Sequence, residues 1–299
     1  MKRLIVAVLV AALVIALVPL VAVAKPDKDK PLPATNVELV KKISLHGHGH
    51  GGGKPSKYAA TGELGEPYTG AKYAVIVGIS DYPWEENDLN YSDDDADDAY
   101  DALTGLYDYS PDNIRLLINM EASFDNIQDA ISDIKGKEVE GDEVVFFFSG
   151  HGARGLAADG DKEKVDEAIV SHDGRPTGNL LYIWDGQLRE WFSRFDTSRI
   201  IFIFDTCLAG GMTDLKAPGR VINMATTEGG TAYEGDQWGN GQFSYYFVDE
   251  GMLKGKADKY DNLEGAQDAT AEEAFDYAKA NCKWQEPTIS DSFDNDLLL

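Results

Sequence analysis

The sequence has few cysteines, few basic residues, and no long apolar run beyond its first two dozen positions. Two cysteines among 299 residues cannot build a disulfide framework, so the fold has to depend on packing. The 27 Lys and Arg residues are outnumbered by 52 Asp and Glu residues, which gives a formal net charge of −25. Because such a surface repels phosphate, we exclude nucleic acid as a partner. Apolar material is plentiful: 43% of the residues are hydrophobic, enough for one large domain or two small ones.

The N-terminus combines basic residues with an apolar run. Lys2 and Arg3 precede this run, which covers residues 4–24 and ends in Ala-Val-Ala. The order is typical of a secretory signal peptide over residues 1–24. The run is also long enough to anchor the chain in a membrane. In either case we expect a secreted or extracytoplasmic protein, whose membrane contact is limited to an uncleaved segment 4–24.

Residues 25–70 are rich in Lys, Pro, Gly and Thr and show little regular periodicity. Such a segment buries too little apolar surface to offset its ordering entropy, which indicates a flexible linker or a propeptide. Within it, His46, His48 and His50 alternate with glycines. Histidine tracts bind transition metals in some proteins, and a flexible glycine-rich tether is the simpler interpretation.

The rest of the chain, residues 71–299, alternates short apolar runs with amphipathic segments. The apolar runs predict strands over residues 73–79, 113–119, 144–148, 168–171, 200–204 and 221–225. Helices are predicted after caps at Ser92, Ser123 and Thr270, and over residues 185–195 and 243–253. Apolar strands that alternate with helices predict an α/β domain, with a mostly parallel central sheet and helices on both faces.

His151 and Cys207 each lie three residues past the end of a predicted strand. Ligands and catalytic groups gather at the carboxyl ends of the strands in such sheets. A cysteine becomes a nucleophile beside a base, and histidine has a suitable pKa near neutrality. Taken singly, however, Cys207 also suits a small buried hydrophobe, and His151 an ordinary loop histidine.

Two motifs together carry a family resemblance. Phe148-Ser-Gly-His-Gly152 and Phe204-Asp-Thr-Cys-Leu-Ala-Gly210 each follow a predicted strand, in that order along the chain. They resemble the signatures of caspase-like cysteine peptidases, and most closely those of the metacaspase and prokaryotic caspase-like branch. The resemblance covers roughly residues 72–280, including segments 75–82, 166–168, 243–247 and 272–275. It implies a caspase-like three-layer sandwich, with helices on both faces of the sheet.

The resemblance also implies a cysteine endopeptidase. Cys207 would attack the scissile carbonyl, while His151 would assist its deprotonation and later protonate the leaving amine. Backbone N–H groups of Gly152 and Cys207 would hold the oxyanion. Leu208 and Ala209 stand where the family often has a His-Ser pair. Because neither side chain belongs to the dyad, we expect activity to survive this departure.

A pocket for a basic side chain is implied in the same way. In the metacaspase branch the positions matching Asp95, Ser149 and Asp205 line the pocket for the residue before the cut and select Arg or Lys. A negative charge near a thiol raises its pKa, so Asp205 makes better sense as an anchor for a substrate cation. Asp95 has a competing role, because it is also the third residue of a helix that Ser92 caps.

Calcium is the cofactor that the resemblance implies, bound by Asp166, Asp185 and Asp214. Several carboxylates on flexible loops suit this ion. The competing roles are an N-cap for Asp185 and plain solvated charge for Asp214. We expect no organic cofactor, and we expect Cys282 to be a buried or free thiol.

The leading hypothesis is an exported cysteine endopeptidase that cuts protein or peptide substrates after Arg or Lys. Calcium and removal of the segment before residue 71 would activate it. Two other classes of function remain open. One is a caspase-like module that binds basic peptides without cutting them, and the other is an extracellular metal-binding acidic protein that uses the histidine tract and the aspartates. The sequence does not predict the oligomeric state.

Overall fold

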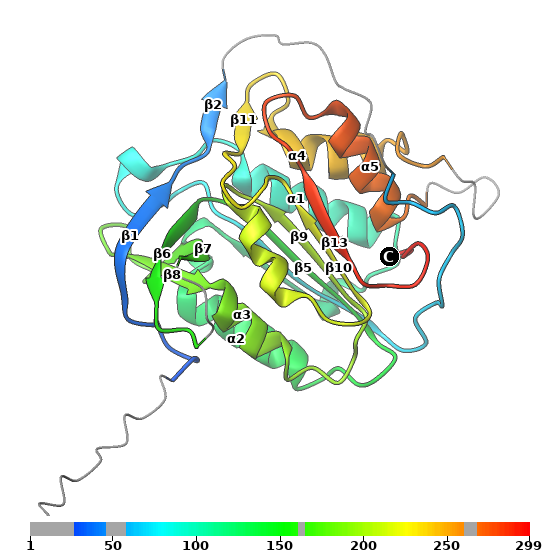
Figure 1. Ribbon diagram of the computed structural model, residues 1–299, viewed down its shortest axis with the longest axis horizontal. Helices are drawn as coiled ribbons and strands as arrows, with labels where there is room; N and C mark the ends of the chain where they lie inside the picture. The colour runs from blue at the N-terminus through cyan, green and yellow to red at the C-terminus, as the bar shows by residue number, and fades with distance from the viewer. Residues whose placement is uncertain (1–26, 46–57, 161–164, 260–267) are drawn as a thin grey trace, which may run out of the picture.

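The computed structural model describes residues 27–45, 58–160, 165–259 and 268–299. The predicted signal peptide or anchor, and the tract of His46, His48 and His50, lie outside these residues. In the described ranges, no helix is long and apolar enough to cross a bilayer. The described chain folds around a central sheet with helices on both faces (Figure 1). This arrangement confirms the predicted α/β sandwich.

The central sheet is built from strands that the sequence pattern predicts, with one addition at its edge. Its described strands are β3 (Lys72–Gly78), β4 (Ile114–Ile118), β5 (Glu143–Ser149), β9 (Ile200–Asp205), β10 (Arg220–Met224) and β13 (Thr288–Asp291). They lie in the order β13-β10-β9-β5-β3-β4. Every neighbouring pair is parallel except β10 with β13, the strand that the pattern did not predict. Strands β5 and β9 are buried along their whole lengths, as parallel strands covered on both faces have to be.

Two groups of helices cover the two faces of this sheet (Figure 1). On one face lie α2 (Phe124–Lys135) and α3 (Asp185–Phe192). On the other lie α1 (Ser92–Gly105), α4 (Gln242–Ser244), the π-helical segment η5 (Tyr245–Leu253) and α5 (Ala271–Asn281). Successive side chains of a strand point to opposite faces. Accordingly, Phe146 packs with the core of the first group and Phe147 with that of the second.

The N-terminal segment forms strands that complete two smaller sheets. An antiparallel sheet contains β1 (Ala34–Val40), β6 (Gly152–Ala157), β7 (Asp166–His172) and β8 (Leu180–Trp184), in that order. A further sheet contains β2 (Ile43–Leu45), β11 (Tyr233–Gly235) and β12 (Asn240–Gly241). Figure 1 shows β1 running beside β6 and the chain then reaching β11 through β2.

The flexible-linker interpretation of residues 25–70 is therefore wrong for residues 34–45. The pattern of this stretch is weak because β1 is largely exposed or half-buried and β2 has only three residues. Their hydrogen-bonding partners, β6 and β11, are more than a hundred residues away in sequence. Tertiary pairing supplies the order that local sequence does not indicate.

Two predicted helix caps are confirmed. The Ser123 hydroxyl accepts a hydrogen bond from the Asn126 N–H at the start of α2. At the start of α5, Thr270 and Glu273 form a reciprocal capping box. In both cases the cap and its partner lie three residues apart, so local sequence is sufficient to predict them.

The predicted cap at Ser92 is wrong, and so is the competing cap role of Asp185, because both residues lie inside their helices. Ser92 is the first residue of α1, and its N–H donates to the Ser80 hydroxyl at 2.9 Å. Ser80 follows β3, so this helix is capped by a residue from another element. Asp185 is likewise the first residue of α3, after Trp184 at the N-cap position. Asp185 is thereby left for the carboxylate group described below.

Candidate active site

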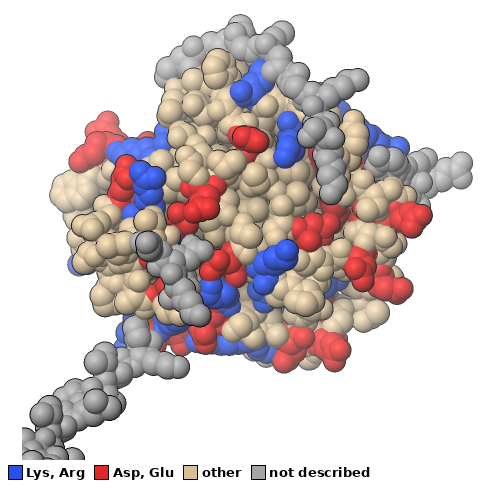
Figure 2. All heavy atoms as spheres, in the orientation of Figure 1, with Lys and Arg blue, Asp and Glu red and all other residues tan. Residues whose placement is uncertain are grey.

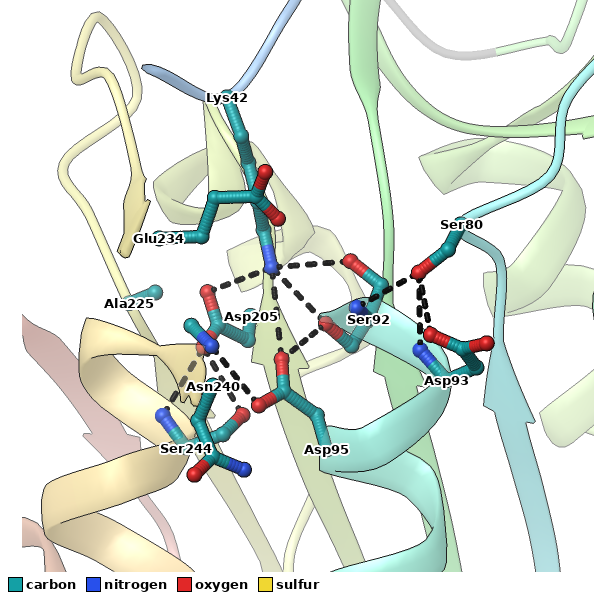
Figure 3. Close-up of polar contacts among 12 residues, drawn as sticks. Lys42, Ser80, Ser92, Asp93, Asp95, Asp205, Ala225, Glu234, Asn240 and Ser244 are labelled. Carbon is teal, nitrogen blue, oxygen red and sulfur yellow. Dashed lines mark hydrogen bonds and ion pairs between the residues drawn. The ribbon is translucent and has the colours of Figure 1, made fainter. Parts of the chain in front are cut away.

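The candidate site lies where β5 and β9 end. In the parallel register of these strands, Ser149 lies opposite Asp205, and His151 and Cys207 follow two residues later. The first turn of α1 brings Asp95 to the same edge of the sheet. The fold thus gathers the three residues of the predicted pocket, which we call the acidic cluster (Asp95, Ser149 and Asp205). Figure 3 shows the Lys42 side chain reaching down from above, with its nitrogen between the carboxylates of Asp95 and Asp205.

Lys42 projects into the acidic cluster from the turn between β1 and β2. Its Nζ lies 3.1 Å from Asp205 Oδ1 and 3.6 Å from Asp95 Oδ2. The ammonium also donates to Ser149 Oγ at 2.8 Å, and Ser149 in turn donates to Asp95 Oδ2 at 2.6 Å. The side chains of Lys42, Asp95 and Asp205 have no exposed surface. A buried ammonium ion without partners would strongly destabilise the fold. The two carboxylates and the serine hydroxyl compensate for its burial.

The charges in this cluster shift the pKa values of its members. Burial alone lowers the pKa of Lys42, but the nearby carboxylates of Asp205, Asp95 and Glu234 outweigh that effect and leave the pKa above its usual value. Burial raises the pKa of Asp95 to about 7; Lys42 opposes this shift and the charge of Asp205 adds to it. Lys42 is therefore an ammonium ion at neutral pH, while Asp95 is poised to bind a proton whenever a cation is missing.

The wall of the acidic cluster comes from the segment that leads into α4. Ser244 donates to Asp205 Oδ2 through its N–H at 2.9 Å and its hydroxyl at 2.8 Å. The Gly241 N–H donates to Asp95 Oδ1 at 2.8 Å. A Cβ atom at Gly241 would lie 2.4 Å from Asp205 Oδ2, so a larger residue does not fit between the two carboxylates. These hydrogen bonds fix both carboxylates in place.

His151 is fully buried and is held on three sides. Its Nε2 lies 2.8 Å from the Asn87 carbonyl oxygen, and its Nδ1 faces the Lys42 N–H at 3.4 Å. A neutral ring with its proton on Nε2 satisfies both contacts. Tyr82 stacks on the ring with centroids 4.8 Å apart, and its hydroxyl accepts from the His151 N–H. Burial lowers the pKa of His151 to about 3.

Cys207 is also buried, and its thiol is engaged by the backbone. Its Sγ accepts a hydrogen bond from the Ala232 N–H at 3.2 Å. Val40 of β1 packs against the small apolar cluster formed by Cys207, Leu208 and Ala232. Burial raises the pKa of Cys207 to about 11; the Ala232 N–H and Lys42 oppose this shift, and Asp205 adds to it. In this arrangement Cys207 is a thiol, and both nitrogens of His151 are occupied by other groups.

Gly152 passes directly beside the backbone of Cys207. A Cβ atom at Gly152 would lie 2.2 Å from the Cys207 carbonyl oxygen. The family resemblance assigns the N–H of this glycine to the oxyanion hole, and its lack of a side chain makes room for the backbone at the end of the neighbouring strand. Leu208 follows with a φ of 61°, a left-handed conformation that is costly for a non-glycine residue and is common at functional sites.

The aspartates assigned to calcium separate into two places. Asp166 and Asp185 are buried together with Asp159, and one oxygen of each lies within 4.8 Å of the others. Asp214 instead forms an ion pair with Arg189 of α3. Three buried carboxylates suit a hard cation such as Ca²⁺. The carboxylate that joins Asp166 and Asp185 is thus that of Asp159, whereas Asp214, in η4 (Ala209–Leu215), pairs with Arg189.

Sequence reasoning missed several residues of the site. Lys42 lay in the presumed linker; the one signal was a basic pair, Lys41-Lys42, at the end of a weakly alternating apolar stretch. Tyr82 was noted only as part of a motif. Gly241 and Glu234 carry no local signal, because their roles depend on which strands they approach. Cys282 is a buried free thiol, as predicted.

Comparisons with known proteins agree with the motifs. Residues 71–297 match the caspase domain family. The chain is 31% identical over 151 residues to Metacaspase-4 of Arabidopsis thaliana, which covers 48% of this chain and 34% of the relative. It is 27% identical over 156 residues to Metacaspase-1 of Candida glabrata, covering 49% of this chain and 39% of the relative. The matched region is thus well under half the length of these relatives.

A solved structure supports the same fold. The crystal structure of a protein from Geobacter sulfurreducens superimposes with a TM-score of 0.53 at 16% sequence identity. The match covers 74% of this chain and 93% of that protein. Identity this low indicates a shared fold and nothing more. The family match alone extends over three quarters of the chain, and it includes the strand ends that bear His151 and Cys207. This chain belongs to the caspase domain family.

Proposed function

We propose that this protein is a cysteine endopeptidase that cuts protein or peptide substrates after Lys or Arg. The observation that carries the specificity is the buried Lys42 ammonium among Asp95, Ser149 and Asp205. A site that accepts a lysine side chain of the chain itself has the charge and depth to accept one from a substrate. The catalytic assignment rests on family membership and on the positions of His151 and Cys207.

In the proposed reaction, a substrate Lys or Arg enters the acidic cluster and places its carbonyl carbon beside Cys207. His151 takes the thiol proton as Sγ attacks that carbon, and backbone N–H groups of Gly152 and Cys207 stabilise the oxyanion. Collapse of the tetrahedral intermediate breaks the C–N bond, and His151 delivers the proton to the leaving nitrogen. Water then hydrolyses the thioester and releases the carboxylate product. Tyr82 is a positioning residue, because it fixes the plane of the imidazole ring.

Calcium is the proposed activator, held by Asp159, Asp166 and Asp185. When bound, the ion would offset most of the charge of three buried carboxylates, which lie after β6, at the start of β7 and at the start of α3. Strand β6 begins at Gly152, one residue after His151, so this site is connected to the candidate dyad through β6. Export, through the basic and apolar N-terminus, is also part of the proposal, and the outside of a cell supplies calcium at high concentration.

The test of this function is cleavage of a peptide library by the native chain and by a variant with Ile43→Pro, each with calcium or a chelator. We expect cuts after Lys and Arg that are lost when Cys207→Ala is added. Cleavage after Asp, or hydrolysis that persists in the Cys207→Ala variant, would contradict the proposal. Tight binding of basic peptides with no cleavage under any condition would favour the non-catalytic module.

A further inference from the structure

The chain that carries Lys42 lies across the candidate active site in a definite direction. We propose that residues 37–45 are a built-in inhibitor, which fills the basic-residue pocket with Lys42 but runs opposite to a cleavable substrate. The inference rests on the proposed function, since the direction of a substrate is defined by the roles of Cys207 and His151. The reversed direction explains why the enzyme does not cleave its own inhibitory segment.

The segment is held by contacts along its whole length. Upstream of Lys42, β1 pairs with β6, so that Val40 lies opposite Gly152 and packs against Cys207 and its neighbours. Downstream, β2 pairs with β11. Ser44 adds a hydrogen bond of 2.6 Å to the buried Glu234 carboxylate. The segment therefore covers the nucleophile and the histidine as well as the acidic cluster.

The direction of the segment follows from two backbone contacts. When a residue fills the pocket of a substrate complex, its own carbonyl is attacked, and the nitrogen of the next residue receives the proton from histidine. Here His151 Nδ1 faces the nitrogen of Lys42 itself. The nitrogen of the next residue, Ile43, donates to the Ala232 carbonyl oxygen at 3.1 Å and is engaged away from the imidazole. The bond between Lys42 and Ile43 is thus not presented for cleavage.

The neighbouring peptide bond is protected for a different reason. The bond between Lys41 and Lys42 does place its nitrogen beside His151. Cutting it would require the Lys41 side chain in the acidic cluster, but that residue is exposed and its Nζ contacts the Glu86 carbonyl oxygen. A reversed segment therefore offers the pocket its preferred side chain while neither adjacent bond has the geometry for reaction. Activity then requires displacement of the segment or a cut elsewhere.

The test compares the native full-length chain with two variants that loosen the segment. Ile43→Pro removes the N–H that bonds to Ala232 and leaves the buried charges intact, because Ile43 is exposed. Lys42→Ala empties the acidic cluster directly. We expect both to hydrolyse Lys- and Arg-terminated reporters about tenfold faster or more, since a larger fraction of molecules is competent. Lys41→Ala is the matched control and should behave as the native chain.

Two further measurements keep the inference separable from the proposed function. Alkylation of Cys207 by iodoacetamide, with the buried Cys282 as internal reference, should accelerate in Ile43→Pro whether or not peptides are cut. Equal alkylation and equal hydrolysis in native and variant chains would overturn the inhibitor and leave the peptidase standing. Accelerated alkylation with no hydrolysis would support a segment that covers Cys207 and would overturn the peptidase.

The direction of the segment has its own readout in the intact chain. Mass spectrometry of the native protein after long incubation should find the Lys42–Ile43 bond whole. A cut at this bond that disappears with Cys207→Ala would show a productive, substrate-like orientation, and it would overturn the reversed inhibitor. A slow rate of cleavage of a free peptide with the sequence of residues 37–45 fits the proposal, because a free peptide can bind in the productive direction.

Discussion

At the scale of single residues, the site depends on charges that are stable only together. Lys42, Asp95 and Asp205 are buried where each alone would be strongly destabilised. Removing one charged partner lowers the stability of the fold by more than the net contribution of the ion pair, because the remaining buried charge is left without compensation. A basic side chain from a substrate meets the same need. The proposed specificity and the proposed inhibition are therefore two consequences of one buried carboxylate pair.

Asp205→Asn should weaken recognition of basic substrates more than any change on the exposed part of α1. Hydrogen bonds to charged groups contribute about 1.5–3 kcal/mol, so kcat/KM for Lys- and Arg-terminated reporters should fall by roughly tenfold to a hundredfold. The measurement is made in the Ile43→Pro background, where the segment is loosened. Asp94→Asn is the control, because Asp94 is an exposed neighbour of Asp95. Equal losses in the two variants would contradict the assignment.

At the scale of elements, the termini of strands and helices set the site. β5 and β9 deliver His151 and Cys207, while α1 delivers Asp95 through the capping of its first turn. The Ser80 hydroxyl accepts from both the Ser92 and Asp93 N–H groups. This contact joins the loop after β3 to α1 and so fixes the distance between Asp95 and the sheet.

Ser80→Ala should reduce the free energy of unfolding by about 1 kcal/mol, the usual worth of a helix cap. Ser92→Ala should cost less, because Ser92 is the first residue inside the helix and its hydroxyl makes only a long contact of 3.4 Å with the Lys42 ammonium. Urea denaturation of the two variants measures the difference. A larger cost for Ser92→Ala than for Ser80→Ala would contradict the assignment of the cap to Ser80.

The loop after β6 gives a second test at this scale. Asp159→Asn should weaken calcium binding by roughly tenfold, because it removes one of three buried carboxylates. Asp214→Asn should leave the affinity unchanged, since Asp214 pairs with Arg189. Isothermal titration of each full-length variant with calcium compares them. The opposite ranking would support the ligand set that the family resemblance implied.

At the scale of the whole molecule, the acidic excess is divided between buried and surface groups. Figure 2 shows Asp and Glu scattered in small groups over one face, with Lys and Arg among them. Other carboxylates are buried, including Glu272 of α5, which accepts a hydrogen bond from the Leu297 N–H at 2.8 Å. Burial raises the pKa of Glu272 to about 8. The neutral form of this group is the one that fits the fold.

The contribution of Glu272 to the stability of the protein should therefore fall as pH rises from about 4 to about 8. In this window the folded state keeps the proton on Glu272, while an unfolded glutamate with a pKa near 4.5 has lost it. The folded state then binds more protons than the unfolded one, so the free energy of unfolding decreases with pH. Glu272→Gln should flatten this slope in urea titrations at pH 5 and 8. An unchanged slope would show that Glu272 does not control it.

Much of the fold could be predicted because the local pattern of apolar residues indicates its strands and helices. Buried strands such as β5 and β9 consist of continuous apolar residues, and the caps at Ser123 and Thr270 need only a partner three residues away. The positions of His151 and Cys207 follow from the same pattern, since parallel strands end at one edge. Local structure was misread at Ser92, where the distant Ser80 supplies the cap, and at Asp185, which lies inside its helix. It was also misread at residues 34–45, whose strands pair with distant segments.

What the sequence by itself determined was the sheet, its helices and the strand ends that bear the candidate dyad. Only the tertiary structure decided which residues meet there from afar. Lys42 reaches the acidic cluster because β1 and β2 pair with strands far along the chain. The folded chain likewise places Asp159, and not Asp214, beside Asp166 and Asp185. Local periodicity reports the backbone and the buried face of an element, whereas long-range pairing depends on surfaces that exist only after folding.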